Sequence, residues 1–373
     1  MTTHVTNSDI ESTGSTGSPD DGGRAVAHRT GGLVVRLFND RLSWRPSRRS
    51  LAVGSLLFLA CLGFFLIGLM IGDFELSLQK VLITLQGEGS RASTLVVLDW
   101  RMPRVLLAGL VGIAFGISGC IFQSISRNAL GSPDIIGFTT GAASGALLQL
   151  LLFGGSSLAV AGGALVGGLG TAAVVYLLAY KGGVQGYRLV LIGIGVSAVL
   201  LSLNSYLIVK VDVEAAQAAA TWITGTLNGR GWLEVQVVGA FVVVLAPVAM
   251  LMNSRLTLME MGDDAAKALG VSVEMSRAIL ILVAVTLTSI GTAAVGPVAF
   301  IALAAPQVAK LLSRSTRPAP LTAGLTGAVM LMFSDFAAQH FFETALPTGV
   351  LTGAVGGLYL VALLVLQWRS NRL

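Results

Sequence analysis

The feature of this sequence that most limits its possible folds is a succession of long apolar segments that are almost free of charge. Only 12% of the 373 residues are charged and 54% are hydrophobic, whereas soluble domains carry about 25% charged residues. A helix needs about 20 apolar residues to cross a bilayer. The sequence therefore predicts an all-α, polytopic membrane protein. Its ten predicted transmembrane helices occupy residues 51–72, 104–125, 134–153, 157–180, 187–209, 235–252, 278–295, 297–313, 320–341 and 349–367.

The residues before the first apolar segment predict a separate tail. Residues 1–30 are rich in Ser, Thr, Gly and Asp and show no apolar periodicity, which is typical of disorder. Residues 33–49 mix apolar side chains with arginines, so they form either a plain basic flank or a short helix lying on an anionic membrane surface. We therefore divide the chain into a disordered, basic tail at 1–50 and a ten-span membrane domain at 51–373.

The distribution of positive charge predicts how the chain is oriented. With ten spans both termini lie on the same side, and placing them in the cytoplasm puts eighteen Lys and Arg residues inside and six outside. Cytoplasmic loops of membrane proteins carry the excess of positive charge, so we expect both termini inside. The same distribution explains the net charge of +5 without any binding of nucleic acid.

Several classes of chemistry lack the residues that they need. Cys61 and Cys120 lie within apolar segments and predict buried free thiols, and two Cys with three His are too few for a transition-metal cluster. The chain has no phosphate-binding loop of the G-x-x-x-x-G-K-[ST] type, no H-E-x-x-H and no G-x-S-x-G motif. We therefore expect no catalytic residue, no bound metal and no bound cofactor in this chain.

The predicted spans also lack the side chains with which a carrier couples to an ion gradient. Asp335 is the main ionisable residue at mid-membrane depth, whereas proton relays and sodium sites need such groups together with partners. An ion-coupled secondary transporter is therefore disfavoured, and a transporter of this composition would take its energy from a partner chain.

Glycines spaced four residues apart predict close approach of neighbouring helices, since in lipid this spacing lets two helix backbones meet. The pairs are Gly112/Gly116, Gly141/Gly145, Gly163/Gly167, Gly349/Gly353 and Gly353/Gly357.

A cytoplasmic segment at 256–270, between the sixth and seventh spans, has a pattern of its own. Acidic residues precede a lysine and then a glycine, as in a short helix whose charges match its dipole and which ends at glycine. Its small residues leave one face flat enough to enter a groove, and the composition also fits an ordinary surface helix. The residues that define the pattern are Gly262, Asp263, Ala266, Lys267, Leu269 and Gly270.

Five further motifs occur in order along the chain. They are Arg101-Met-Pro-Arg104, Gly116-Ile-Ser-Gly-Cys-Ile-Phe-Gln123 followed by Arg127-Asn128-Ala129-Leu130, Trp222-Ile-Thr-Gly225, Gly296-Pro297-Val-Ala-Phe-Ile-Ala-Leu-Ala-Ala-Pro306, and Glu343-Thr-Ala-Leu-Pro-Thr-Gly349. Together with the pattern at 256–270, they resemble the permeases of ATP-binding-cassette (ABC) importers for ferric siderophores, haem and vitamin B12. The resemblance covers about residues 51–373. Three motifs depart from the family pattern. Ala129 stands in place of a proline, Pro306-Gln307-Val308-Ala309-Lys310 stands where the family has P-H-I-x-R, and Gln339 stands in place of an arginine.

This resemblance implies a vitamin B12 importer-type permease fold in the plasma membrane of a bacterium. The chain would be the permease subunit that moves a ferric siderophore complex into the cytoplasm, with haem or a corrinoid as alternative cargo. It implies three kinds of protein partner: a second permease subunit, identical or paralogous, two cytoplasmic ATPase subunits that use ATP and Mg, and an extracytoplasmic substrate-binding protein.

The resemblance also implies roles for particular residues. The segment at 256–270 would be the coupling helix that contacts the ATPase. Arg101 and Arg104 would face outward and dock acidic residues of the binding protein, although both could instead anchor the second span at the membrane interface. Candidates for the translocation path are Gln123, Asn128, Gly296 and Pro297.

Overall fold

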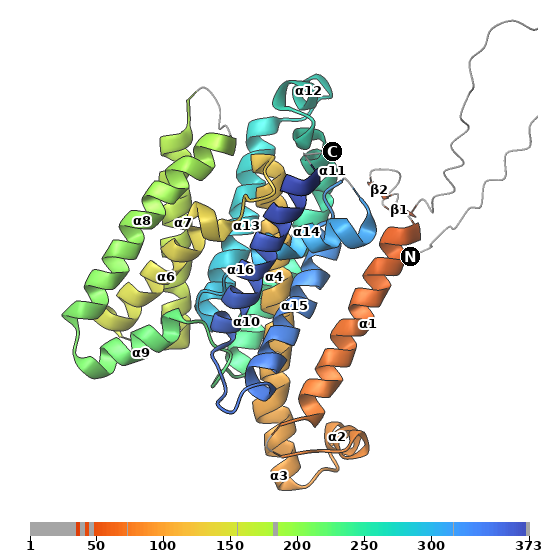
Figure 1. Ribbon diagram of the computed structural model, residues 1–373, viewed down its shortest axis with the longest axis vertical. Coiled ribbons are helices and arrows are strands. Elements are labelled where there is room, and N and C mark those ends of the chain that lie inside the picture. Colours follow the sequence, from red (N-terminus) through yellow and green to blue (C-terminus); the bar gives the residue numbers. More distant parts are fainter. Residues whose placement is uncertain are drawn as a thin grey trace, which may run out of the picture. The chain divides into compact units, whose positions relative to one another are not determined.

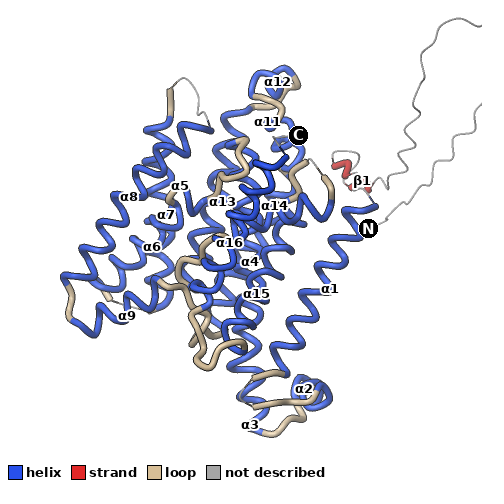
Figure 2. The backbone as a smooth tube through the Cα atoms, viewed as in Figure 1, coloured by secondary structure: helices blue, strands red, loops and turns tan. Residues whose placement is uncertain are grey.

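Apolar helices form most of this chain, because a backbone in lipid satisfies its N–H and C=O groups within a helix. The structure is a computed structural model, and it describes residues 35–37, 42–44, 48–72, 74–154, 156–181, 186–315 and 317–370. Each predicted span has a matching helix (Figures 1 and 2). These are α1 (Arg48–Met70), α4 (Met102–Ser126), α6 (Phe138–Leu148) continued by the π-helix η2 (Gln149–Phe153), α7 (Ser157–Ala179), α8 (Gly186–Lys210), α10 (Trp232–Leu251), α13 (Val273–Val295), α14 (Ile301–Ser313), α15 (Pro320–His340) and α16 (Thr348–Ser370).

Length and hydropathy separate these helices into two groups. Within the described residues, 7 helical segments are long and apolar enough to cross a membrane. They are Arg49–Met70, Arg91–Ser126, Ser157–Ala179, Gly186–Lys210, Trp232–Leu251, Val273–Val295 and Pro320–His340. The apolar helices Phe138–Phe153, Ile301–Ser313 and Thr348–Ala362 are shorter. The all-α fold is thus confirmed, and the count of ten crossings stays a prediction.

The chain divides into two units, Met1–Ala52 and Val53–Leu373. The described part of the first contains β1 (Val35–Leu37) and β2 (Leu42–Trp44), which pair antiparallel with Val35 opposite Trp44. The short membrane-surface helix considered for 33–49 is therefore wrong, because both triplets alternate apolar and polar side chains with the period of a strand. The predicted disorder of 1–30 falls outside the described residues.

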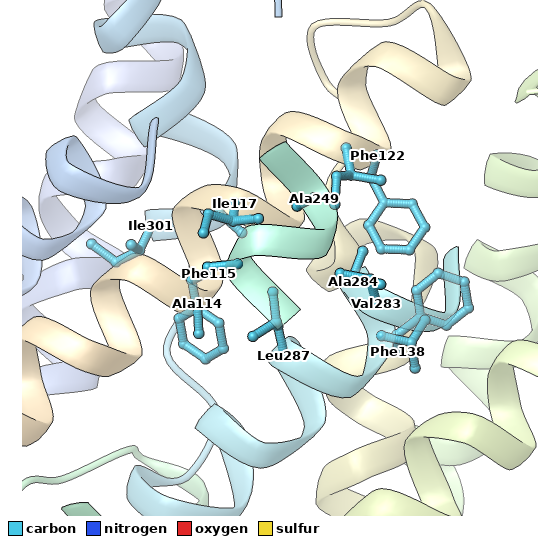
Figure 3. Close-up of a cluster of buried hydrophobic side chains, with 14 of the residues drawn as sticks. Ala114, Phe115, Ile117, Phe122, Phe138, Ala249, Val283, Ala284, Leu287 and Ile301 are labelled. Carbon is cyan, nitrogen blue, oxygen red and sulfur yellow. The ribbon is translucent and has the colours of Figure 1, made fainter. Parts of the chain in front are cut away.

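Helix α4 lies at the centre of the second unit, packed against α10, α13, α14 and α15. Its aromatic side chains Phe115 and Phe122 are fully buried in the core, and Figure 3 shows Phe115 near Leu287 of α13 and Phe122 near Ala249 of α10. The ring centroids of Phe122 and Phe138 of α6 lie 5.0 Å apart. A helix buried on all sides needs apolar residues around its whole circumference, which explains why this span shows no polar face.

Glycines allow the helices around α4 to approach at backbone distance. A Cβ on Gly112 or Gly116 would overlap the carbonyl oxygens of Gly327 and Ala323 in α15, and Gly145 meets the backbone of Gly163 in α7 in the same way. The helix-packing interpretation of these glycine pairs is confirmed. On α16, by contrast, a Cβ on Gly353 or Gly357 would have nothing within 4 Å.

The segments between the long helices lie at two opposite ends of the second unit (Figure 1). One end carries α2 (Leu78–Leu85), α3 (Arg91–Thr94), the π-helix η1 (Leu95–Arg101) and α9 (Val213–Ile223). The other end carries α11 (Asn253–Glu260) and α12 (Asp263–Ala268). The motif at Arg101–Arg104 and the pattern at 256–270 are thus separated by the length of the bundle.

Two predicted helices are broken where glycine takes a positive φ. Residues 256–270 form α11 and α12 rather than one helix, because Gly262 between them has φ +126°. The span predicted at 297–313 becomes helical only at Ile301, after Gly296 with φ +78° and Phe300 with φ +67°. Glycine reaches such angles without steric cost, so the break at Gly262 follows from the sequence. The positive φ of Phe300, by contrast, is uncommon for a residue with a side chain, and nothing in the sequence signals it.

Candidate functional site

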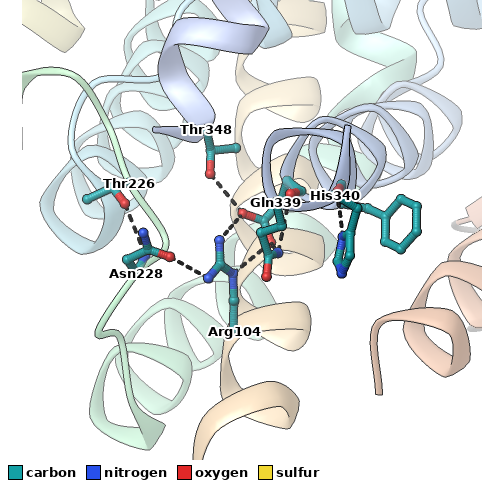
Figure 4. A network of polar contacts seen from close by, with 8 residues as sticks. Arg104, Thr226, Asn228, Gln339, His340 and Thr348 are labelled. Carbon is teal, nitrogen blue, oxygen red and sulfur yellow. Dashed lines mark hydrogen bonds and ion pairs between the residues drawn. The ribbon is translucent and has the colours of Figure 1, made fainter. Parts of the chain in front are cut away.

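A polar network ties together four segments at the end of the unit that carries α2, α3 and α9 (Figure 4). Arg104 of α4 forms a two-pronged ion pair with Asp335 of α15, with Nε–Oδ2 and Nη2–Oδ1 distances of 2.9 and 2.8 Å. Asp335 also accepts hydrogen bonds of 2.8 Å from Gln339 Nε2 and from Thr348 Oγ1 at the start of α16. Arg104 Nη1 donates to Asn228 Oδ1, in the loop after α9.

The low exposure of Arg104 and Asp335 indicates that their ion pair contributes to the stability of the fold. The side chains of Arg104 and Asp335 are 17% and 4% exposed, so each charge depends on the other for compensation. Gln339, which stands where the resemblance expects an arginine, donates to the same carboxylate as a neutral group. His340 does not replace that arginine, because its Nδ1 lies 2.8 Å from Phe336 O and its ring stacks on Phe336.

Arg101 is also engaged within the chain. Its Nη1 donates to Leu69 O at 2.9 Å and Met70 O at 3.2 Å, and its Nη2 donates to Phe74 O at 2.8 Å. The carbonyls at the end of a helix have no partner within the helix. Arg101 therefore caps α1 by donating hydrogen bonds to its last carbonyl groups. The predicted docking of Arg101 and Arg104 to a binding protein stays a prediction, and the hydrogen bonds within the chain show what such a partner would compete with.

Three of the sequence motifs meet in one glycine junction at this same end. Thr226 N donates to Val295 O at 2.7 Å, and Gly349 N donates to Gly225 O at 2.9 Å. Gly225, Gly296 and Gly349 lie so close that a Cβ on any of them would overlap a neighbouring carbonyl. Gly296 and Pro297, two path candidates, thus help to fasten α9, α13 and α16 together.

The other two path candidates lie elsewhere. Gln123 is only 4% exposed, and it joins α4 to α14 by donating to Leu303 O at 2.8 Å and accepting from Gln307 Nε2 at 2.6 Å. Asn128 is exposed in the loop after α4, and its Oδ1 accepts from Leu130 N at 2.9 Å. The structure therefore does not bring the four candidates together, and it buries Gln123 between α4 and α14.

Asp134 has a role that sequence reasoning missed. It is the second residue of α5 (Pro133–Ile136), in the first turn of this short helix. Its Oδ2 accepts from Phe300 N at 3.3 Å and its Oδ1 from Thr139 Oγ1 at 2.7 Å. Asp134 therefore supplies an acceptor to the non-helical backbone before α14, which lipid could not do. The signal was an isolated acidic residue at the edge of an apolar span.

At the opposite end of the unit, Asp263 of α12 lies between two arginines. Its Oδ1 accepts from Arg127 Nη2, just past the end of α4, and its Oδ2 accepts from Arg277 Nη2 in α13 at 2.7 Å. Arg277 is 2% exposed and also donates to Glu274 Oε1 at 3.0 Å. Sequence reasoning singled out Asp263, and Arg127 as part of a motif, but it did not single out Arg277 or predict that the three side chains meet.

The two arginines determine the charge state of this carboxyl. Burial alone would raise the pKa of Asp263, but the hydrogen bond and charge of Arg277, followed by those of Arg127, outweigh it and lower the pKa below its ordinary value. The group is therefore ionised at neutral pH. Its contribution to stability is lost only as the pH falls through this lowered pKa.

One expectation about α12 is wrong. Ala266 was predicted to lie on the flat face that enters a partner's groove, but it is 0% exposed and belongs to the core of its own chain. The large exposed apolar side chains here are Met261 at 70% and Leu269 at 62%, and Ala265, Lys267 and Ala268 are exposed as well. The surface available to a partner is thus the one that carries Met261 and Leu269.

A small cavity of about 180 Å³ lies between η2, α7, α10 and α13. Apolar side chains line most of it, together with Trp222, Arg230 and Glu234. Pockets for drug-sized ligands measure about 300–1,000 Å³, so this cavity is too small for such a molecule. Within the described residues, no three His, Cys, Asp or Glu side chains gather as they would around a metal ion.

Comparison with known proteins gives consistent results over nearly the whole chain. The FecCD transport family matches residues 58–366. The ferric enterobactin transport system permease protein FepG of Escherichia coli strain K12 is 45% identical over 326 residues, which cover 87% of this chain and 99% of FepG. The achromobactin transport system permease protein CbrC of Dickeya dadantii strain 3937 is 34% identical, covering 87% of this chain and 97% of CbrC.

A solved structure has the same fold. It is an inward-facing conformation of a metal-chelate type ABC transporter, with a TM-score of 0.76 and 26% sequence identity. The match covers 84% of this chain and 99% of that chain.

Proposed function

Since the chain belongs to the FecCD transport family, we propose that it is the permease subunit of an ABC importer and carries a ferric siderophore complex into the cytoplasm. The observation that carries this proposal is the identity of 45% with a ferric enterobactin permease across 99% of that protein's length. The chain is a transport protein of the inner membrane and not an enzyme, so hydrolysis of ATP with Mg belongs to separate ATPase subunits.

The ATP dependence of uptake tests this function. We expect proteoliposomes that hold this chain, its ATPase and its binding protein to take up radioactive ferric enterobactin only when ATP is present on the ATPase side. Uptake should persist when ionophores collapse the proton and sodium gradients, because the predicted spans offer few ionisable groups for coupling. Haem and cobalamin serve as competing cargo. Uptake driven by an imposed ion gradient without nucleotide would falsify the proposal.

We place the path for the cargo at the interface with a second permease subunit, identical or paralogous. The cavity of about 180 Å³ beside η2, α7, α10 and α13 is smaller than the pockets that hold drug-sized ligands, which supports a path outside it. From the distribution of positive charge, we place both termini and the end with α12 in the cytoplasm. The end with α2, α3 and α9 would then face the extracytoplasmic binding protein. Asp335 already neutralises the charge of Arg104. Acidic residues of the binding protein would therefore have to compete with Asp335 for this guanidinium.

The ATPase subunits are proposed to contact the exposed face of α12. Replacing Met261 and Leu269 together by aspartate should abolish co-purification of the ATPase, since these side chains are 70% and 62% exposed and the change places two charges in an apolar contact. Insertion of the permease in the membrane should remain normal. The control is Val213→Asp, an equally exposed apolar residue on α9, at 76%. Unchanged ATPase recovery from the double variant would place the contact elsewhere.

A further inference from the structure

The cytoplasmic end of the unit contains an ion-pair arrangement whose geometry suggests a mechanical role. Each oxygen of the Asp263 carboxylate is bound by a different helix, Oδ1 by Arg127 at the end of α4 and Oδ2 by Arg277 in α13. Arg127 also donates through Nε to Met259 O at 3.1 Å, at the end of α11. The corner between α11 and α12 therefore binds the Arg127 guanidinium at two points.

The two arginines differ in burial, and this difference assigns them different tasks. The Arg277 side chain is 3% exposed and is compensated by Asp263 and Glu274. It is thus a fixed anchor within the protein. The Arg127 side chain is 43% exposed and directly follows α4, so it connects Asp263 to the loop that it begins.

The ion pairs of Asp263 fix the orientation of α12, which has few other contacts with the membrane helices. It is a helix of 6 residues between Gly262 and Gly270, whose φ values are +126° and +82°. A Cβ on either glycine would have nothing within 4 Å. Two such glycines can act as hinges. A force on α12 would then rotate this helix locally and would not displace the membrane helices. Apart from the buried Ala266, Asp263 is the residue of α12 that ties this short helix to the membrane helices.

Arg127 leads directly into the loop between α4 and α5. This loop carries the exposed Asn128, and Ala129 O lies 3.5 Å from Gln307 Nε2 of α14, whose side chain also donates to Gln123 Oε1 at 2.6 Å. A displacement of Arg127 therefore reaches the end of α4 and the middle of α14. We propose that Asp263 is a positioning residue that makes α12 move as one body with the cytoplasmic end of α4, so that ATPase motion reaches the loop at 127–132.

This proposal rests on the proposed function, and its test compares ATP hydrolysis with uptake in the assembled transporter. Asp263→Asn should leave ATPase recovery and hydrolysis within about twofold of the unmodified protein. Uptake should fall by about tenfold or more, the size expected when hydrogen bonds between charged groups are lost. The control is Glu260→Gln, which removes the charge from the 3.7 Å pair with Lys310 at the same corner and should leave the ratio of hydrolysis to uptake unchanged.

Arg127→Gln separates transmission from folding, because it leaves the buried Arg277 paired with Asp263. It should reproduce the loss of uptake without lowering the melting temperature. The double variant Asp263→Asn with Arg127→Gln should be no worse in uptake than either single variant, since residues that act through one contact are not additive. Arg127→Lys, which keeps the charge, should recover part of the uptake.

Two results would overturn the inference. One is a ratio of hydrolysis to uptake in Asp263→Asn that equals that of Glu260→Gln. The other is an additive double variant, which would show that the two residues act separately. Failure of the proposed function looks different, because the unmodified transporter itself would then show no ATP-dependent uptake.

Discussion

Replacing Asp335 by alanine is expected to lower the free energy of unfolding by about 3–5 kcal/mol, because it leaves the Arg104 charge partly buried without its partner. The same change removes the carboxylate that binds Arg104 of α4 and Thr348 of α16, and it leaves Gln339 only the backbone carbonyl of residue 335 as acceptor. Uptake should fall with the amount of folded protein. Gln339→Ala removes one donor from the same carboxylate and should lower the free energy of unfolding by only about 1 kcal/mol.

The two free cysteines offer a way to measure this loss. Cys120 is 2% exposed in α4, whereas Cys61 is only partly buried. In a Cys61→Ala background, a thiol-reactive fluorophore should therefore report the melting temperature through the exposure of Cys120 alone. Arg104→Met combined with Asp335→Leu removes both charges and should melt above Asp335→Ala. If Asp335→Ala melts like the unmodified chain, the ion pair contributes nothing to the fold.

Replacing Gly119 by alanine is expected to lower the free energy of unfolding by about 3 kcal/mol. A Cβ at this position would overlap the carbonyl oxygen of Ala302 in α14, and overpacking against a rigid backbone is destabilising. Pro306 lies four residues after Ala302 and has no N–H to donate to that carbonyl. The carbonyl of Ala302 therefore lacks the hydrogen bond that it would normally accept within α14. Gly119 lets α4 pack directly against this carbonyl.

The expected result for Gly119→Ala is a lower melting temperature of the complex and loss of the folded fraction from detergent extracts. Gly162→Ala in α7 is the matched control, because its Cβ would have nothing within 4 Å. There alanine should be neutral or slightly stabilising, as it is in most helix interiors. Equal melting of the two variants would contradict the close packing of α4 on α14.

The sequence predicted the helices well because the bilayer sets their length and hydropathy in a way that each segment reveals by itself. It predicted the partners of polar side chains poorly, because these partners are set by tertiary packing. Arg104 and Asp335 lie 231 positions apart in the chain, and Arg127 and Asp263 lie 136 apart. No local pattern links residues over such distances.

The direction of α12 shows the same limit on a smaller scale. Alanines lie on more than one side of this short helix, so small size alone did not identify the face that turns inward, and Ala266 was assigned to the wrong side. The motifs around Gly225, Gly296 and Gly349 were recognised one by one. Their meeting in a single junction became visible only in three dimensions.

The shortness of α14 has a consequence for how the chain enters the membrane during synthesis. Its 13 residues give a helix of about 20 Å, whereas the hydrocarbon layer is about 30 Å thick. Gln307 and Lys310 further reduce its tendency to leave the translocon for lipid. The neighbouring helices α13 and α15 are both long and apolar enough to insert by themselves. We therefore expect α14 to become embedded only after α15 has been synthesised, when helices on both sides can hold its ends in place.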